Sequence, residues 1–363
     1  MRRTEGRWWI PDGFLDGVCE HDTMVHTLHP APQPDGCPMF LPAPVDLHVH
    51  GGGGHDAMSG EAAIRGMLRT HARHGTGALL ATSVTAPFPD IDAFIAAAVS
   101  VMRAPDDGAA TLLGVHLEGP FISPDKLGAQ PPHAATLDLD RLESWFGSGV
   151  VRIITFAPEV DPDGRLIAAC KRHGVRAQIG HTACSWQRAQ RALQSGCGVT
   201  HLYNAMSGVA HREGGAATAA LAYAGYAEII LDGFHVERAA FDAARRAVPG
   251  LYSVTDGTAA SGMPDGDYTL GSLQVRKRDG CVLLPDGTLA GSCLTQRAVV
   301  AVLRGWDVGW HDIGALLAAV PARWLGDRRL GRIAPGALAH WLEIQEGVPV
   351  ALWSSGRRIE LDD

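Results

Sequence analysis

The sequence predicts an α/β fold: a (β/α)8 TIM barrel with a small β-sandwich domain formed from both termini. Short apolar runs alternate with alanine-rich runs in which apolar positions recur every three or four residues, a pattern typical of parallel strands connected by helices. The length of 363 residues exceeds that of a usual single core, but α/β barrels with insertions reach it. Hydrophobic residues make up 46% of the chain, which is ample material for a large core.

The first 44 residues contain short apolar pieces separated by proline-rich turns, so we expect a few short strands there. A strand-like C-terminal tail can pair with them, at 337–343, 348–353 and 358–361. We therefore expect a small β domain from residues 1–44 and 330–363, and a barrel from residues 45–329.

Eight strands are expected in the barrel, at 45–50, 77–84, 111–117, 150–157, 175–180, 199–203, 227–232 and 251–255. Helical patterns lie between them, as at 61–74, 90–103, 163–173, 186–195 and 237–247. An insertion near 259–290 carries two Pro-Asp-Gly turn signals and is predicted to form a hairpin. Helices are expected to follow it around 295–304 and 311–319.

Composition limits the classes of partner and the compartment. The formal net charge of −8 argues against a nucleic-acid partner. No apolar run approaches the length of a membrane span, and the charged start of the chain does not resemble a secretion signal, so we expect no membrane partner. Seven scattered cysteines without a Cys-x-x-Cys pair fit reduced thiols. Together these features predict a cytoplasmic protein.

The first predicted barrel strand ends in His48 and His50 and is followed by four glycines at 51–54. Side chains alternate along a strand, so both imidazoles face the same way and could bind one cation. The glycines allow the backbone to turn sharply beneath the histidines. Two polar positions at a solvated barrel mouth would explain the His-x-His pair equally well.

Further nitrogen and carboxylate side chains stand where other predicted strands end, namely Glu118, His181, His201, His235 and Asp256. Taken singly, each has an ordinary explanation as a helix cap or as a polar residue at the mouth of the barrel. All of them converge at the C-terminal end of a barrel, however, and burying them together without a cation would be costly. The set therefore predicts a metal centre.

Glu118, His181 and His201 form a combination of two histidines and one carboxylate that suits a catalytic zinc with one open position. Asp256 is then the leading general base, because a carboxylate beside an activated water can take its proton. His48 and His50 could complete a second metal site that shares Glu118, or could orient the first. The residues alone leave one and two ions open.

Longer motifs surround these residues: His-Leu-Glu-Gly-Pro at 116–120, Lys-Leu-Gly-Ala-Gln at 126–130, Gly-His-Thr at 180–182, Thr-His-Leu-Tyr-Asn-Ala-Met at 200–206, His-Arg-Glu at 211–213, Asp-Gly-Phe-His at 232–235, Thr-Asp-Gly at 255–257 and Leu-Ala-Gly-Ser at 289–292. With them the chain resembles the amidohydrolase superfamily and, within it, the N-acetylglucosamine-6-phosphate deacetylases. The resemblance runs along most of the chain. The loop at 210–215 differs from the family pattern by lacking one histidine and one proline.

The resemblance implies hydrolysis of the acetamide of N-acetyl-D-glucosamine 6-phosphate to glucosamine 6-phosphate and acetate, in amino-sugar catabolism, by a homodimer. It implies that Glu118, His181 and His201 bind the catalytic divalent metal and that Asp256 is the acid/base residue. His235 can donate to the carbonyl oxygen as charge develops there. Substrate contacts would fall on Ala129, Gln130, Asn204, Ala205, His211, Arg212, His235, Leu289, Ala290 and Gly291.

Other functions remain compatible with the sequence. A related amide hydrolase could act on N-acetylgalactosamine 6-phosphate, on an unphosphorylated acetamido sugar or on an N-acyl amino acid. Arg212 discriminates among these, because its planar fork suits a phosphate that uncharged substrates lack. A catalytically silent barrel with a binding role is the remote alternative, since a fold does not by itself imply a function.

Overall fold

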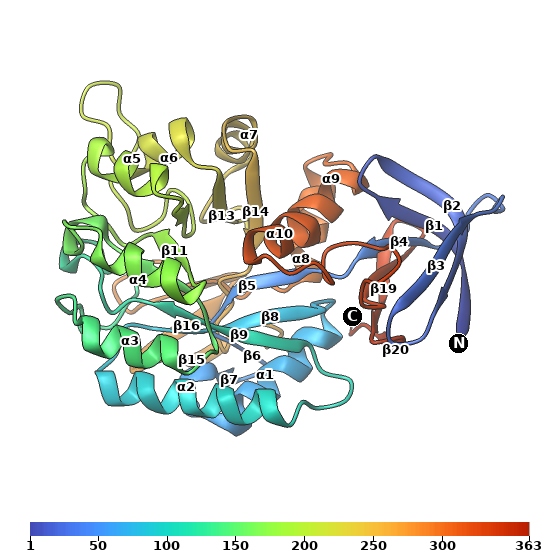
Figure 1. The fold of residues 1–363 in the computed structure, drawn as a ribbon, viewed down its shortest axis with the longest axis horizontal. Helices are drawn as coiled ribbons and strands as arrows, with labels where there is room; N and C mark the ends of the chain where they lie inside the picture. The colour runs from blue at the N-terminus through green and yellow to red at the C-terminus, as the bar shows by residue number, and fades with distance from the viewer. Residues whose placement is uncertain (363) are drawn as a thin grey trace.

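Eight parallel strands follow one another in chain order around one barrel (Figure 1), as the sequence predicted. The structure is a computed structural model that describes residues 1–362. The strands are β5 (Val45–Val49), β8 (Ala78–Ser83), β9 (Thr111–Glu118), β10 (Val151–Phe156), β11 (Arg176–Ile179), β12 (Gly198–Val199), β13 (Tyr226–Ile230) and β14 (Gly250–Val254). A parallel bridge between Val49 and Gly257 joins the first strand to the chain leaving the last one. The barrel strands are almost wholly buried, because side chains fill the interior and helices cover the outside.

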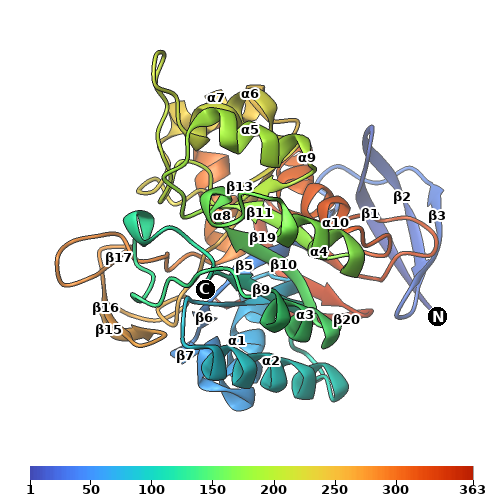
Figure 2. The same ribbon diagram turned by 60° about the vertical axis from the view of Figure 1, so that its left-hand side comes forward.

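The helices that connect the strands lie on the outside of the barrel (Figures 1 and 2). They are α1 (Glu61–Arg73), α2 (Phe88–Arg103), α3 (Leu139–Gly147), α4 (Arg165–His173), α5 (Trp186–Gln194), α6 (Ala216–Tyr223) and α7 (Arg238–Ala247). Each packs an apolar stripe against the strands; α5, for example, buries Ala189, Ala192 and Leu193 and exposes its polar face.

The helices after the eighth strand depart from the prediction in one detail. α8 (Gln296–Gly305) is where the sequence places it, but the next helix continues from α9 (Trp310–Gly314) through a π-helical turn (Ala315–Ala319) into α10 (Val320–Leu325). Pro321 has no N–H to donate back to the preceding turn, so the regular α-helical bonding pattern is interrupted where α10 begins. Among residues 1–362, no helix is long and apolar enough to cross a membrane.

The insertion after β14 forms three antiparallel strands rather than the predicted hairpin. They are β15 (Gly266–Leu270), β16 (Leu273–Arg278) and β17 (Cys281–Leu283). The tight turn between the first two is at Gly271, whose φ is +56°, and not at either Pro-Asp-Gly signal. The Gly271 N–H donates to Asp56 Oδ2 at 2.6 Å, which anchors this small sheet beside the first barrel strand.

The two ends of the chain build a seven-stranded sheet of order β20-β19-β18-β4-β1-β2-β3. Its strands are β1 (Arg2–Ile10), β2 (Gly13–His21), β3 (Val25–Pro30), β4 (Met39–Pro42), β18 (Trp341–Gln345), β19 (Val348–Ser354) and β20 (Arg357–Glu360). The sheet curls until Met24 bridges Leu338, and it encloses Trp8 and Trp341 with ring centroids 5.1 Å apart. The layers of the expected sandwich thus belong to one continuous sheet, in which β1 and β2 are longer than predicted.

Candidate metal centre and active site

His48 and His50 lie at the end of β5 with both rings buried and turned to the same side, as the alternation of the strand predicts. His48 Nδ1 lies 3.0 Å from Glu228 Oε2, and His50 Nδ1 lies 3.2 Å from Thr82 O. Because each Nδ1 already faces an acceptor, both Nε2 atoms are left to face the centre, where they lie 3.1 Å apart.

The short antiparallel pair β6 (Gly51–Gly52) and β7 (His55–Asp56) explains the glycines after His50. A Cβ on Gly51 would collide with the backbone of His55 and Ala259, so the chain can turn back only without a side chain there. The turn keeps the end of β5 at the floor of the barrel mouth.

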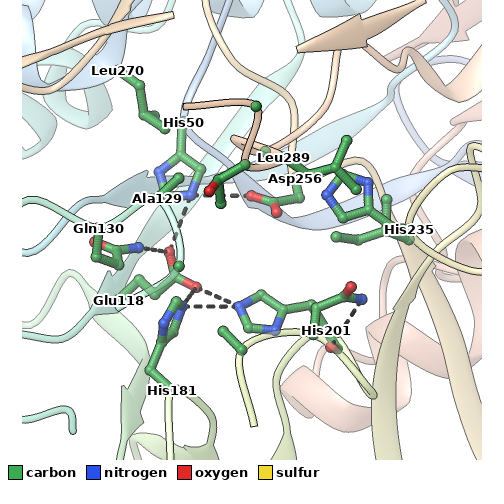
Figure 3. A pocket seen from close by; sticks show the side chains of 17 residues that line it. His50, Glu118, Ala129, Gln130, His181, His201, His235, Asp256, Leu270 and Leu289 are labelled. Carbon is green, nitrogen blue, oxygen red and sulfur yellow. Dashed lines mark hydrogen bonds and ion pairs between the residues drawn. The ribbon is translucent and has the colours of Figure 1, made fainter. Parts of the chain in front are cut away.

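The carboxylate of Glu118, at the end of β9, lies between two pairs of histidines, of which Figure 3 shows His50, His181 and His201. Its Oε1 is 3.1 Å from His181 Nε2 and 2.9 Å from His201 Nε2. Its Oε2 is 3.2 Å from His50 Nε2 and 3.5 Å from His48 Nε2. One carboxylate therefore bridges two donor sets, each made of two imidazole nitrogens and one oxygen.

The spacing within each pair fits a bound ion. The Nε2 atoms of His181 and His201 are 3.1 Å apart, as are those of His48 and His50. Two donors on one tetrahedral zinc at about 2.0–2.1 Å are separated by roughly 3.3 Å. His181 is held by a 2.8 Å contact from its Nδ1 to Lys126 O, which leaves its Nε2 to face Glu118. The residues present thus fit one divalent ion at His181 and His201 and a second at His48 and His50.

Asp256 completes the floor of the site beside the histidines of β5. Its Oδ1 lies 3.1 Å from His50 Nε2 and 3.3 Å from His48 Nε2. Burial alone would raise the pKa of this carboxyl, but the neighbouring imidazoles lower that pKa to about 2. His48 and His181 likewise outweigh burial and hold the pKa of Glu118 well below its usual value. Both carboxylates are therefore ionised at neutral pH.

Three of these residues have backbone conformations that side chains rarely adopt, with φ of 45° at His181, 28° at His201 and 51° at Asp256. The positive φ of His201 ends β12 at Val199, whereas the sequence predicted extended chain to residue 203. Such conformations persist only where the surrounding structure fixes them, and they are common at functional sites.

His235, in the loop after β13, faces the same cavity from the other side (Figure 3). The carboxylate of Asp232 accepts from the backbone N–H of His235 at 2.7 Å and lies 2.6 Å from its Nδ1. Burial alone would lower the pKa of His235, but Asp232 raises it above the ordinary value. A protonated His235 can therefore donate from Nε2 into the cavity.

The cavity at the C-terminal ends of the strands has a volume of about 430 Å³ and brings most of the predicted site residues together. Its lining includes His50, Glu118, Ala129, Gln130, His181, His201, Asn204, Ala205, His235, Leu270, Asp256, Leu289 and Gly291. His48 and Ala290 are fully buried behind this lining. The Gln130 carboxamide is engaged at both ends, because Oε1 accepts from Thr85 N at 2.6 Å and Nε2 donates to Glu118 Oε2.

His211 and Arg212 are the predicted residues that the structure does not bring to the cavity. Both are exposed, in the loop between β12 and α6 that projects from the molecule (Figures 1 and 2). Neither lines the cavity of its own chain, so their contact with substrate stays a prediction.

Sequence reasoning missed the residues that hold the site residues in place. Asp232 orients His235, Thr85 fixes Gln130, and Glu228 faces His48. A signal was available for Glu228, since a carboxylate in the middle of the apolar run Tyr226–Ile230 has to face a partner inside the barrel. Thr85 carries no such signal, because its contact is made by its backbone.

A TIM barrel with imidazoles and carboxylates meeting at the C-terminal strand ends, around a cavity that reaches them, defines a metal-dependent hydrolase. The model of the amidohydrolase family matches residues 39–231. The chain belongs to this family.

Curated relatives give a finer comparison. The chain is 35% identical to the N-acetylgalactosamine-6-phosphate deacetylase of Escherichia coli O157:H7 over 330 residues, 88% of this chain and 87% of that protein. It is 33% identical to the N-acetylglucosamine-6-phosphate deacetylase of Vibrio furnissii over 377 residues, 99% of this chain and 94% of that protein.

Solved structures agree with this assignment. The N-acetylglucosamine-6-phosphate deacetylase of Thermotoga maritima superposes with a TM-score of 0.91 at 28% identity, covering 99% of this chain and 100% of that one. A mutant of the Mycobacterium smegmatis enzyme of the same name, in complex with N-acetyl-D-glucosamine-6-phosphate, superposes with a TM-score of 0.89 at 28% identity, covering 97% of both chains.

Proposed function

We propose that this protein is a metal-dependent deacetylase that converts N-acetyl-D-glucosamine 6-phosphate and water to glucosamine 6-phosphate and acetate in amino-sugar catabolism. The observation that carries the proposal is the position of Glu118 between two pairs of buried imidazoles, with ionised Asp256 beside them at the floor of a cavity. Relatives that share most of the chain's length carry this activity in their names.

We assign Glu118, His181 and His201 to the catalytic divalent ion, and His48 and His50, with Glu118, to a second ion. Zinc is our proposed metal, since imidazole nitrogens with one carboxylate are a donor set that zinc uses in catalytic sites. When bound, the ion supplies Lewis acidity toward the amide carbonyl and toward water.

The protein's own residues move the protons. Asp256 accepts a proton from the attacking water, whose oxygen forms a bond to the acetyl carbon, and delivers a proton to the nitrogen as the C–N bond breaks. His235, held by Asp232 at 2.6 Å, donates to the carbonyl oxygen as negative charge develops on it. Acetate and the free amine are the products.

The sugar is assigned to the cavity wall formed by residues other than the proposed metal ligands. Ala129, Asn204, Ala205, Leu289 and Gly291 line it. We assign Gln130 and Ala290 to substrate contacts made by their backbone atoms. The Gln130 carboxamide is already hydrogen-bonded at both ends, and the Ala290 side chain is buried.

The 6-phosphate is assigned to Arg212 and His211. Both lie in the exposed loop between β12 and α6, so this role requires the loop to reach a cavity mouth, either by closing over its own cavity or by packing of a second chain. We propose a homodimer, in which the second chain could provide that packing.

The proposed division of the chain follows the seven-stranded terminal sheet and the eight-stranded barrel sheet. Residues 1–44 and 330–363 form the small β domain, and residues 45–329 form the barrel. We place the enzyme in the cytoplasm, which the seven free cysteines support.

N-acetylgalactosamine 6-phosphate is the second candidate substrate, favoured by the 35% identity to the Escherichia coli enzyme of that specificity. Acetate release from the two epimeric 6-phosphates, from unphosphorylated N-acetylglucosamine and from an N-acetyl amino acid tests both. We expect the highest kcat/KM with N-acetylglucosamine 6-phosphate. A preference for the galactose epimer would make N-acetylgalactosamine 6-phosphate the substrate and leave the proposed deacetylation unchanged. No acetate release from any of the four compounds would overturn the proposed function.

A further inference from the structure

Glu228 is a fully buried carboxylate of β13 that lies beneath the proposed metal centre. Its Oε2 is 3.0 Å from His48 Nδ1. Its Oε1 accepts from the Gln178 carboxamide at 2.8 Å and lies 3.3 Å from the Tyr252 hydroxyl oxygen. A carboxylate is costly to bury, so this one is expected to have a task that a neutral side chain cannot perform.

Binding an ion of its own is not that task. Glu228, His48 and His116 lie close enough to suggest a donor set. His116, however, has both ring nitrogens engaged, with Nδ1 at 3.0 Å from Leu47 O and Nε2 at 2.7 Å from Thr155 Oγ1. No lone pair of His116 is left for a metal, and Glu228 is left facing the ring of His48.

The contact to Glu228 fixes which nitrogen of His48 carries the hydrogen. An ionised carboxylate can only accept, so the hydrogen resides on Nδ1 and the lone pair of Nε2 is directed at His50 and Glu118. The other proposed ligands lack such support: His50 and His181 face backbone carbonyls, and His201 Nδ1 has no partner among the described residues.

We propose that Glu228 is a positioning residue that holds His48 in its metal-binding tautomer and thereby sets the metal affinity of the His48 and His50 pair. This inference rests on the proposed function, because it assigns a partner to one of its metal ligands. Carboxylates behind metal-binding histidines orient the ring and raise its basicity, and their loss typically weakens binding about 10–100-fold.

The surroundings of Glu228 make substitution by glutamine informative. Gln178 Oε1 accepts from Tyr252 at 2.8 Å and from Trp324 Nε1 at 2.7 Å, so the Gln178 amide must point its NH2 group at position 228. Glu228 Oε2 also accepts a longer contact, 3.4 Å, from the His201 backbone N–H, whereas Gln178 donates to Oε1 at 2.8 Å. Because the Gln178 contact is the shorter, we expect the new carboxamide in Glu228→Gln to turn its oxygen toward Gln178 and its NH2 toward His48. His48 would then accept at Nδ1 and carry its hydrogen on Nε2, where it blocks a metal.

The test is calorimetric titration of the metal-free protein with zinc, with metal content measured by mass spectrometry. We expect two equivalents in the wild type, and in Glu228→Gln a loss of affinity of about 10–100-fold at one site with a smaller change at the other, where Glu228 makes only a 3.4 Å contact to the His201 backbone. Combining Glu228→Gln with His48→Gln should weaken zinc no further than His48→Gln alone, because both act through the same ring. Glu343→Gln, which alters a buried carboxylate in the terminal sheet, is the matched control and should bind zinc as the wild type does.

A second measurement uses no substitution at Glu228. Nitrogen-15 imidazole spectra of the zinc-loaded wild type should show His48, identified by its absence in His48→Gln, with the hydrogen on Nδ1. A hydrogen on Nε2, unchanged zinc binding in Glu228→Gln, or a wild type that binds only one equivalent would each overturn the inference. Acetate release by the wild type would in all three cases leave the proposed function standing.

Discussion

Asp232 holds His235 by two contacts at once, one from each carboxylate oxygen, to the ring Nδ1 at 2.6 Å and to the backbone N–H at 2.7 Å. Asp232 raises the pKa of His235, so the protonated ring persists to higher pH than a free histidine would.

Replacing Asp232 by asparagine should lower the pKa of His235 and move the alkaline limb of kcat to lower pH. We expect kcat at pH 8 to fall about tenfold or more, because less of the variant carries the protonated ring that donates to the carbonyl oxygen, with a smaller change in KM. An unchanged pH profile would exclude this role for the pair.

Asp256 is predicted to be the residue that shuttles the proton. Asp256→Asn removes the base but preserves the size of the side chain, so the fold and the bound metal should persist. Turnover should fall on the order of a hundredfold or more. Kinetics should be measured together with the zinc content of the same preparation, because near-normal turnover in a metal-loaded variant would show that another group takes the proton.

The two pairs of histidines predict a specific metal count. The double variant His48→Gln, His50→Asn should lose one equivalent of zinc and keep the one at Glu118, His181 and His201. Metal analysis after dialysis distinguishes the outcomes. Loss of all metal would mean that the β5 pair contributes to the primary site, whereas full activity with one equivalent would make that pair auxiliary.

The barrel could be predicted almost strand by strand because its strands are buried apolar runs that end at polar or glycine positions. The exception is β12, which ends at Val199 because His201 takes a positive φ. Local sequence did not reveal this conformation, because a positive φ at a residue other than glycine depends on the surrounding structure. The third strand of the insertion was missed for a different reason. The prediction relied on the conspicuous Pro-Asp-Gly signals, whereas the turn between the first two strands is at Gly271.

The metal-binding residues were predictable because histidines and carboxylates at strand ends are chemically conspicuous. Ala129 and Leu289 have no such chemistry, and only the resemblance to a family pointed to them. Glu228 and Asp232 act on other side chains, and their partners became visible only once the strands were placed side by side.

His340 predicts a pH dependence of stability in the terminal sheet. The ring is buried, its Nδ1 lacks a partner among the described residues, and burial lowers its pKa to about 4. The unfolded chain, with a pKa near 6.5, binds the proton first, so the free energy of unfolding falls as pH drops from about 6.5 to 4. The contribution of His340 over this window is roughly 3 kcal/mol.

Chemical denaturation of the wild type and of His340→Asn at pH 7 and pH 4.5 checks this. The variant should lose less stability than the wild type between the two pH values, while His29→Asn, an exposed histidine of the same sheet, should follow the wild type. Equal losses in all three proteins would show that His340 does not titrate as its burial implies.

Arg212 is the residue on which the phosphate specificity depends. It is exposed in the loop between β12 and α6, and it is not part of the cavity lining of its own chain. A charge-assisted contact to a phosphate contributes about 1.5–3 kcal/mol, or roughly tenfold to a hundredfold in kcat/KM. A surface pair with Glu213 or another carboxylate would contribute less than about 1 kcal/mol.

Arg212→Ala should therefore raise KM for N-acetylglucosamine 6-phosphate by about tenfold or more and leave hydrolysis of unphosphorylated N-acetylglucosamine nearly unchanged. Arg212→Lys keeps the charge without the planar fork and should recover part of the loss. Arg238→Ala, at an exposed arginine of α7, is the control and should match the wild type on both substrates. If Arg212→Ala impairs both substrates equally, the loop serves the structure of the site and the phosphate is bound elsewhere.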